Sequence, residues 1–146
     1  MTVRIEQCID IAASPSAIWA AIDDIPQHGQ WMHDAIEITP LSDQRQGIGA
    51  EFTCLTKVGP FRERDVLRVT EWVPGATMGI EHLGVVKGWG RFTLMPNGDT
   101  GSHFCWAEQL QFPWWMGGAV GERAARPVLA RVWRRNLERL RDLVER

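Results

Sequence analysis

Residues 9–31 read IDIAASPSAIWAAIDDIPQHGQW, a stretch that joins the end of an alternating run to two proline-marked segments. The run over residues 3–11 alternates mostly apolar with polar side chains, which is typical of a strand with one buried face. Ser14 and Pro15 supply an N-cap and a first-turn proline, so a short helix is expected after that strand. Pro26 ends this helix and starts a second short helical segment. The stretch therefore predicts a strand followed by two short helices.

Further along the chain, Gly, Pro and Asn residues separate runs that are rich in β-branched and aromatic side chains. These runs are the predicted strands 36–41, 50–57, 62–72, 77–83, 88–95 and 102–112. Their short connections favour antiparallel pairing of sequential strands, because a parallel pair needs a long crossover. We therefore expect the strands to form one meandering sheet.

Beyond Pro113 the spacing of the apolar residues changes to the helical period. The apolar face of the predicted helix consists of Leu129, Val132, Trp133, Leu137, Leu140 and Val144. A start near Met116 is expected, with a weak point at Pro127, because an interior proline removes a backbone hydrogen bond. A start at Pro127 itself is the alternative. Either way, the chain is predicted to end in a long amphipathic helix.

Composition excludes several classes of partner and location. A chain of 146 residues fits one domain, expected to span residues 1–146, and its formal net charge is −2. No overall field therefore attracts nucleic acid or an anionic membrane. Residues 1–8 lack the features of a signal peptide, and no apolar run is long enough for a membrane span. We expect a soluble cytoplasmic protein with no nucleic-acid partner and no stable membrane insertion.

The cysteines and the absent motifs argue against metal and nucleotide chemistry. Cys8, Cys54 and Cys105 are odd in number and widely spaced, which favours reduced thiols over a disulfide framework. Their spacing matches no metal-binding pattern. G-x-S-x-G, H-E-x-x-H and a phosphate-binding glycine loop before a helix are missing as well. We therefore expect no metal and no cofactor.

Four stretches together carry a resemblance to a known superfamily. They are residues 9–31, VTEWVPGATMGIEHLG (69–84), VKGWGRFTLMP (86–96), and CWAEQLQFP (105–113) with the following RPVLARVW (126–133). The chain resembles the START-like superfamily of SRPBCC proteins, in particular its bacterial polyketide cyclase/dehydrase and lipid-transport branch. The resemblance implies an α+β helix-grip fold, in which a curved seven-stranded antiparallel sheet wraps around the C-terminal helix. It also implies a cavity that in many relatives holds a lipid, a polyketide or another apolar molecule.

Glu108 is the exceptional residue of the last predicted strand. If residues 104–112 alternate strictly, one face carries aromatic and aliphatic side chains and this single carboxylate. Desolvation favours the neutral form of such a carboxyl, which is one way in which general acids are prepared. A structural or rim carboxylate paired with arginine is the alternative reading. The available arginines are Arg64, Arg91 and Arg123.

The other candidate site residues follow from strand faces and from the resemblance. His82 shares a strand face with Ile80, so it either exchanges a proton with a ligand or is satisfied by its neighbours. Small residues over 117–125 favour a void under the last helix, unless Gly117 and Gly118 form a loop and the helix begins later. The predicted ligand-binding residues are Trp31, Ile80, Phe92, Phe104, Trp106, Leu110, Phe112, Trp115 and Gly121.

These observations support three hypotheses of different classes. The leading one is the binding of a small hydrophobic or amphipathic molecule, such as a lipid, polyketide or aromatic metabolite, in an internal cavity. The second is an enzyme of the polyketide cyclase/aromatase type, with Glu108 or His82 as catalytic residues in proton transfer. The third is a protein-interaction module that uses exposed aromatic surface. One fold hosts binding and catalysis alike, and the sequence leaves the ligand and the oligomeric state open.

Overall fold

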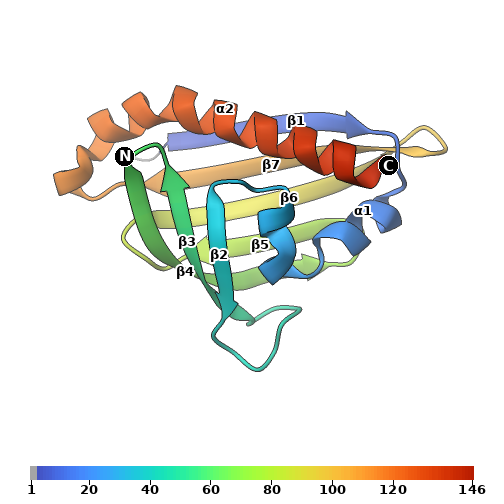
Figure 1. The fold of residues 1–146 in the computed structure, drawn as a ribbon, viewed down its shortest axis with the longest axis horizontal. Helices are drawn as coiled ribbons and strands as arrows, with labels where there is room; N and C mark the ends of the chain where they lie inside the picture. Colours follow the sequence, from blue (N-terminus) through green and yellow to red (C-terminus); the bar gives the residue numbers. More distant parts are fainter. Residues whose placement is uncertain (1–2) are drawn as a thin grey trace.

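The computed structural model describes residues 3–146, and its elements follow the expected order (Figure 1). Within these residues, seven strands form one antiparallel sheet in the order β1-β7-β6-β5-β4-β3-β2. The strands are β1 (Val3–Ile11), β2 (Ala35–Pro40), β3 (Glu51–Val58), β4 (Phe61–Val73), β5 (Thr77–His82), β6 (Lys87–Asn97) and β7 (Gly101–Gln111). The first and the last strands are neighbours, as the helix-grip fold requires. The predicted fold class is confirmed.

Two short helical elements follow β1. In α1 (Pro15–Ile22), the Ala17 amide donates to Ser14 Oγ at 3.2 Å, so the predicted N-cap is present. The next element is the 3-10 helix η1 (Ile25–Gln30). Together they contribute buried apolar side chains to the core.

The long helix begins two residues later than the expected start near Met116. A 3-10 turn, η2 (Trp114–Met116), leads into α2 (Gly118–Val144), and Pro127 lies inside α2 without ending it. Gly117 joins the two elements with a φ of 94°, a left-handed conformation that glycine adopts without steric cost. The start at Pro127 is therefore excluded.

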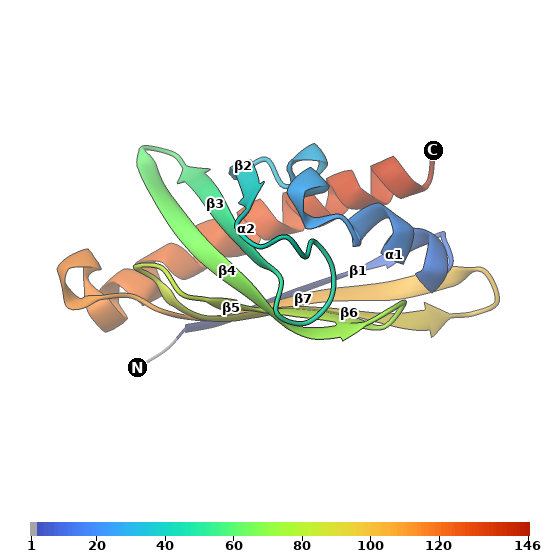
Figure 2. The ribbon, with the colours of Figure 1, turned by 90° about the horizontal axis from the view of Figure 1, so that it is seen from below.

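The sheet curves around α2. Figure 2 shows β2, β3 and the adjoining part of β4 rising from the plane of the other strands toward the side on which α2 lies. A register shift between Val69 and Glu71 interrupts the β4–β5 pairing, and such bulges bend a strand and increase its twist. The concave face and α2 enclose the core. From α2, the buried residues Trp133, Leu137 and Leu140 reach into it.

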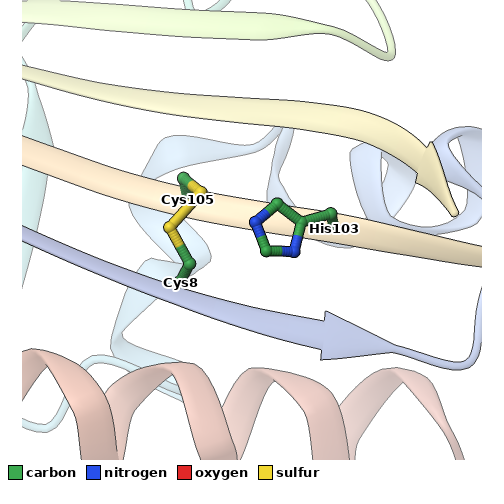
Figure 3. A group of neighbouring side chains, drawn as sticks. All are labelled: Cys8, His103 and Cys105. Atoms are coloured by element: carbon green, nitrogen blue, oxygen red, sulfur yellow. A yellow bond between two sulfur atoms is a disulfide. The ribbon is translucent and has the colours of Figure 1, made fainter.

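The expectation of three reduced thiols is wrong for two of them. Cys8 on β1 and Cys105 on β7 form a disulfide, and they are direct partners in the register of the two strands (Figure 3). Their separation of 97 residues concealed the pairing, because only the closure of the fold makes β1 and β7 neighbours. Cys54 is free and buried. Among residues 3–146, no helix is long and apolar enough to cross a membrane.

Candidate functional site

A cavity of about 520 Å³ lies between the concave face of the sheet and α2. Strands β2 to β7, both 3-10 elements and α2 contribute to its walls, which are mostly apolar. The predicted ligand-binding residues that line it are Ile80, Phe92, Trp106, Leu110 and Phe112. A cavity of this size accommodates a small organic molecule, because ligand pockets commonly measure about 300–1,000 Å³.

The other predicted ligand-binding residues lie outside the cavity wall. Trp31 and Phe104 are completely buried, and their rings pack against Phe92, which does line the cavity. Trp115 is 61% exposed on η2. A Cβ atom at Gly121 would collide with a carbonyl oxygen of that 3-10 turn, so this glycine allows η2 and α2 to pack closely. Of the small residues over 117–125, only Ala125 borders the cavity.

A row of hydrogen-bonded ionisable groups crosses one wall of the cavity. His82 Nδ1 lies 2.6 Å from Asp65 Oδ2, and His82 Nε2 lies 2.6 Å from Glu108 Oε1. Asp65 Oδ1 also accepts hydrogen bonds from the amides of Val66 and Gly84, at 2.8 and 2.9 Å. Three strands, β4, β5 and β7, each supply one member of this row, which we call the Asp65–His82–Glu108 chain.

Glycines make room for the chain. Glu108 on β7 reaches His82 on β5 across β6, where Gly90 is its direct partner. A Cβ atom at Gly90 would lie 2.8 Å from Glu108 Oε1, closer than real Cβ atoms come. A Cβ atom at Gly84 would likewise collide with Asp65 Oδ1. Gly90 on β6 and Gly84 in the connection between β5 and β6 therefore leave space for the two carboxylates.

The two carboxylates hold His82 in its charged form. Burial by itself lowers the pKa of His82, but the charge of Glu108 and the hydrogen bonds to Asp65 and Glu108 outweigh it and raise that pKa from 6.5 to about 10. At neutral pH both ring N–H groups are donors, one to each carboxylate. The partner of Glu108 is thus a histidine and not one of the expected arginines, and Arg91 pairs with Glu71 instead.

A family model described as polyketide cyclase / dehydrase and lipid transport matches residues 2–145. The chain belongs to this family. The resemblance seen in the sequence is thereby confirmed. A search of curated proteins finds no match.

Several solved structures share the fold of this family member, although their sequence identity to it is low. A START superfamily protein from Mycobacterium smegmatis is 12% identical, with a TM-score of 0.81 and 97% of both chains covered. The Zhui aromatase/cyclase from a Streptomyces species is 15% identical, with a TM-score of 0.77, covering 100% of this chain and 95% of that chain. Norcoclaurine synthase from Thalictrum flavum, in complex with dopamine and hydroxybenzaldehyde, is 14% identical, with a TM-score of 0.71 and coverage of 99% and 87%.

Two further carboxyl groups, those of Asp34 and Glu63, also border the cavity. Asp34 Oδ1 accepts a hydrogen bond from the Asn136 amide at 2.6 Å, and burial raises the pKa of Asp34. Glu63 Oε1 accepts from the Val86 amide at 3.1 Å, and burial raises the pKa of Glu63 as well. Both carboxyl groups therefore already have protein partners that fix loops or α2.

Two other residues on the cavity wall, Cys54 and His28, are uncharged at neutral pH. Burial raises the pKa of the Cys54 thiol to about 11, so the reactive thiolate is scarce at neutral pH. Burial lowers the pKa of His28 to about 4, and His28 Nε2 lies 2.7 Å from the carbonyl oxygen of Ile22. Neutral His28 therefore serves as a structural donor that holds α1 and η1 together.

His82 and Glu108 were named as candidates from the sequence, but Asp65, which contacts His82, was not. The missed signal is present in the predicted strand 62–72, where Glu63, Asp65 and Leu67 occupy alternate positions. All three border the cavity, so two carboxylates stand on the inward face of a strand. A strand was predicted over this segment, but its faces were not assigned.

Proposed function

We propose that this protein binds a small hydrophobic or amphipathic molecule in the cavity between the sheet and α2. The observation that supports the proposal is a cavity of about 520 Å³ whose mostly apolar wall carries the Asp65–His82–Glu108 chain. Burial of the apolar part of a ligand supplies affinity, at roughly 25 cal/mol per Å² removed from water. The polar chain supplies orientation, as a few placed polar groups do in ligand pockets.

The chain favours a ligand that donates a hydrogen bond. Both nitrogens of His82 are engaged, so the histidine offers a ligand no free donor or acceptor. Glu108 engages the histidine through Oε1, which leaves its second oxygen as an acceptor. A hydroxyl or amine group on the ligand would satisfy that oxygen, and a purely hydrocarbon ligand would leave it unpaired.

The cavity is tested by blocking it. A neutral naphthylamine dye should bind the native protein with a stoichiometry of one and quench tryptophan emission, because Trp106 and Trp133 line the wall. Ala125 borders the cavity, whereas Ala124 beside it is exposed. Ala125→Trp should abolish binding and Ala124→Trp should leave it unchanged. Equal binding by both variants would refute the cavity as the binding site.

A second candidate function is proton-transfer catalysis of the cyclase or dehydratase type. The observation that favours it is the hydrogen bonding of Glu108 to a histidine that is itself held by Asp65. In this role Glu108 would exchange a proton with the substrate, and His82 would hold the carboxyl group in place through its hydrogen bond. Asp65 would be a positioning residue that fixes the orientation of the imidazole.

A further inference from the structure

The opposite face of the sheet carries a second cluster of chemically active side chains. Cys8 and Asp10 stand two residues apart on β1, and His103 and Cys105 stand two residues apart on β7. In the register of these strands, Cys8 pairs with Cys105 and Asp10 pairs with His103. Residues two apart on a strand share a face, so the four side chains form a compact square on the convex surface. Figure 3 shows the two sulfur atoms and the imidazole side by side.

The histidine of this square is oriented for ligation. Its Nδ1 lies 2.7 Å from Asp10 Oδ1, so Nδ1 carries the proton and donates to the carboxylate. The lone pair of the neutral ring is then on Nε2. Figure 3 shows one ring nitrogen of His103 turned toward the sulfurs of Cys8 and Cys105. Metal-binding histidines commonly donate their second N–H to a carboxylate in this way.

We propose that Cys8, Cys105 and His103 bind one zinc ion when the disulfide between the two cysteines is reduced, with Asp10 positioning the histidine. One ligand atom from each of the three residues lies within 4.8 Å of the others. Zinc–sulfur bonds of about 2.3 Å and zinc–nitrogen bonds of about 2.0 Å fit ligand atoms spaced that closely. Two thiolates and an imidazole bind zinc in preference to harder ions such as Mg²⁺ or Ca²⁺. The fourth position is open to water, because the His103 side chain is 46% exposed.

Reduction of the Cys8–Cys105 disulfide makes the two sulfur atoms available to the metal. A dithiol reductant donates two electrons and two protons to the Cys8–Cys105 bond, gives two thiols, and is itself oxidised to a disulfide. Zinc then replaces the two thiol protons, which pass to solvent, and binds the resulting thiolates. In the oxidised protein the sulfurs are bonded to each other and the site does not exist. Disulfide and zinc thus tie the edge strand β1 to β7 in alternative states.

The zinc site is independent of the proposed ligand cavity. On the same two strands, Ile9 and Trp106 point to the opposite face and belong to the buried core, and Trp106 borders the cavity. Cys8, His103 and Cys105 do not border the cavity. Zinc binding can therefore succeed or fail without any change in dye binding at the cavity.

The test measures zinc affinity of the full chain in both redox states. Protein reduced with a phosphine under anaerobic conditions should bind one Zn²⁺ per chain in competition with a chromophoric chelator, and oxidised protein should bind at least about 100-fold more weakly. Co²⁺ in place of zinc should show thiolate-to-metal charge transfer. His103→Gln and Asp10→Asn should each weaken binding by about 10–100-fold, and replacing both Cys8 and Cys105 by serine should abolish the charge-transfer band.

Matched controls use the residues of the same kinds that lie elsewhere. Cys54→Ser and His33→Gln should bind zinc as the wild type does, since Cys54 is buried and His33 is exposed away from the square. His103 is exposed, so His103→Gln should fold normally. This variant therefore still tests the proposal if a cysteine variant does not fold. The proposal is overturned if the reduced protein binds no zinc, if oxidised protein binds equally well, or if His103→Gln leaves the affinity unchanged.

Discussion

His82 Nε2 and Glu108 Oε1 lie 2.6 Å apart although their strands are not neighbours. Strand β6 runs between them, and the contact passes over Gly90. Any residue with a Cβ atom at this position would crowd the carboxylate. The buried pair is thus a product of three strands in fixed register. The effects of this pair on the His82 pKa and on the free energy of unfolding can be tested without knowing the ligand.

Gly90→Ala should loosen the pair. The new Cβ would lie 2.8 Å from Glu108 Oε1, so the carboxylate must shift away from His82. The pKa of His82 should then fall below its native value of about 10, because the charge of Glu108 helps to raise it. An NMR titration of the imidazole measures this change. Gly79→Ala, which crowds Glu71 instead, is the matched control and should leave the His82 pKa in place.

The stability of the protein should depend on the ionisation of His82. Its pKa is about 10 in the folded chain and 6.5 ordinarily, so the group contributes stability that is complete below about pH 6.5 and is lost as pH rises through about 10. Urea unfolding at intervals from about pH 7 to pH 10 should show this decline in the wild type and a smaller one in His82→Gln. The same variant should cost about 3–5 kcal/mol at pH 7, since it leaves buried carboxylates unpaired. A variant as stable as the wild type would contradict the ion pairs.

Core packing under α2 is tested at Leu137, which is completely buried. Leu137→Ala removes apolar contacts and leaves a void, which should lower the free energy of unfolding by about 2–5 kcal/mol. Val120 on the same helix is 77% exposed, so Val120→Ala should change it by no more than about 0.5 kcal/mol. Chemical denaturation of both variants makes the comparison. Similar losses in the two would show that α2 is not packed as described.

The helices and strands were predictable because their signals are local, whereas the wrapping of the sheet around the last helix was expected from the resemblance. Alternation over residues 3–11, the Ser14–Pro15 start of a helix and the spacing of Trp133 and Leu137 each determine a local structure from a few neighbouring residues. The exact start of α2 was not, because Pro127 is unfavourable in a helix interior by about 3 kcal/mol and yet lies inside one. Tertiary packing of the helix against the sheet outweighs that local cost.

The candidate site was predictable only as far as strand faces determine it. Alternation places Glu108 and His82 on the inward face, and both residues border the cavity. The contact between the two residues also depends on the register of β5, β6 and β7 and on the space at Gly90, which the alternation of faces does not determine. The disulfide between Cys8 and Cys105 was missed because it depends on the register of β1 with β7. Trp115 was misplaced because an aromatic residue near a cavity does not reveal which way a 3-10 turn faces.

Ligand selectivity should follow the acceptor that Glu108 offers. A naphthol has a hydroxyl donor that the methoxynaphthalene of the same ring lacks, so wild-type protein should prefer the naphthol by about tenfold, which corresponds to about 1.4 kcal/mol. Glu108→Gln keeps the shape and an oxygen for His82, and turns an N–H₂ group toward the cavity in place of the acceptor. The preference should disappear or reverse. Unchanged selectivity, measured by displacement of a bound dye, would show that Glu108 does not contact the ligand.

The same Glu108→Gln change separates binding from catalysis. In a binding protein the only consequence is altered selectivity, because no step requires a proton to move. In a cyclase or dehydratase the amide cannot exchange a proton with the substrate, so turnover should fall by about 10²–10⁴-fold while apolar affinity is retained. Asp65→Asn tests the positioning role separately, since it removes a charge that raises the His82 pKa and leaves one oxygen to accept either from His82 or from the Val66 and Gly84 amides. In an enzyme, this variant should shift the pH–rate profile rather than eliminate turnover. If a candidate polyketide substrate binds and is recovered unchanged from wild-type protein, that substrate is bound without being converted, and catalysis on it is refuted.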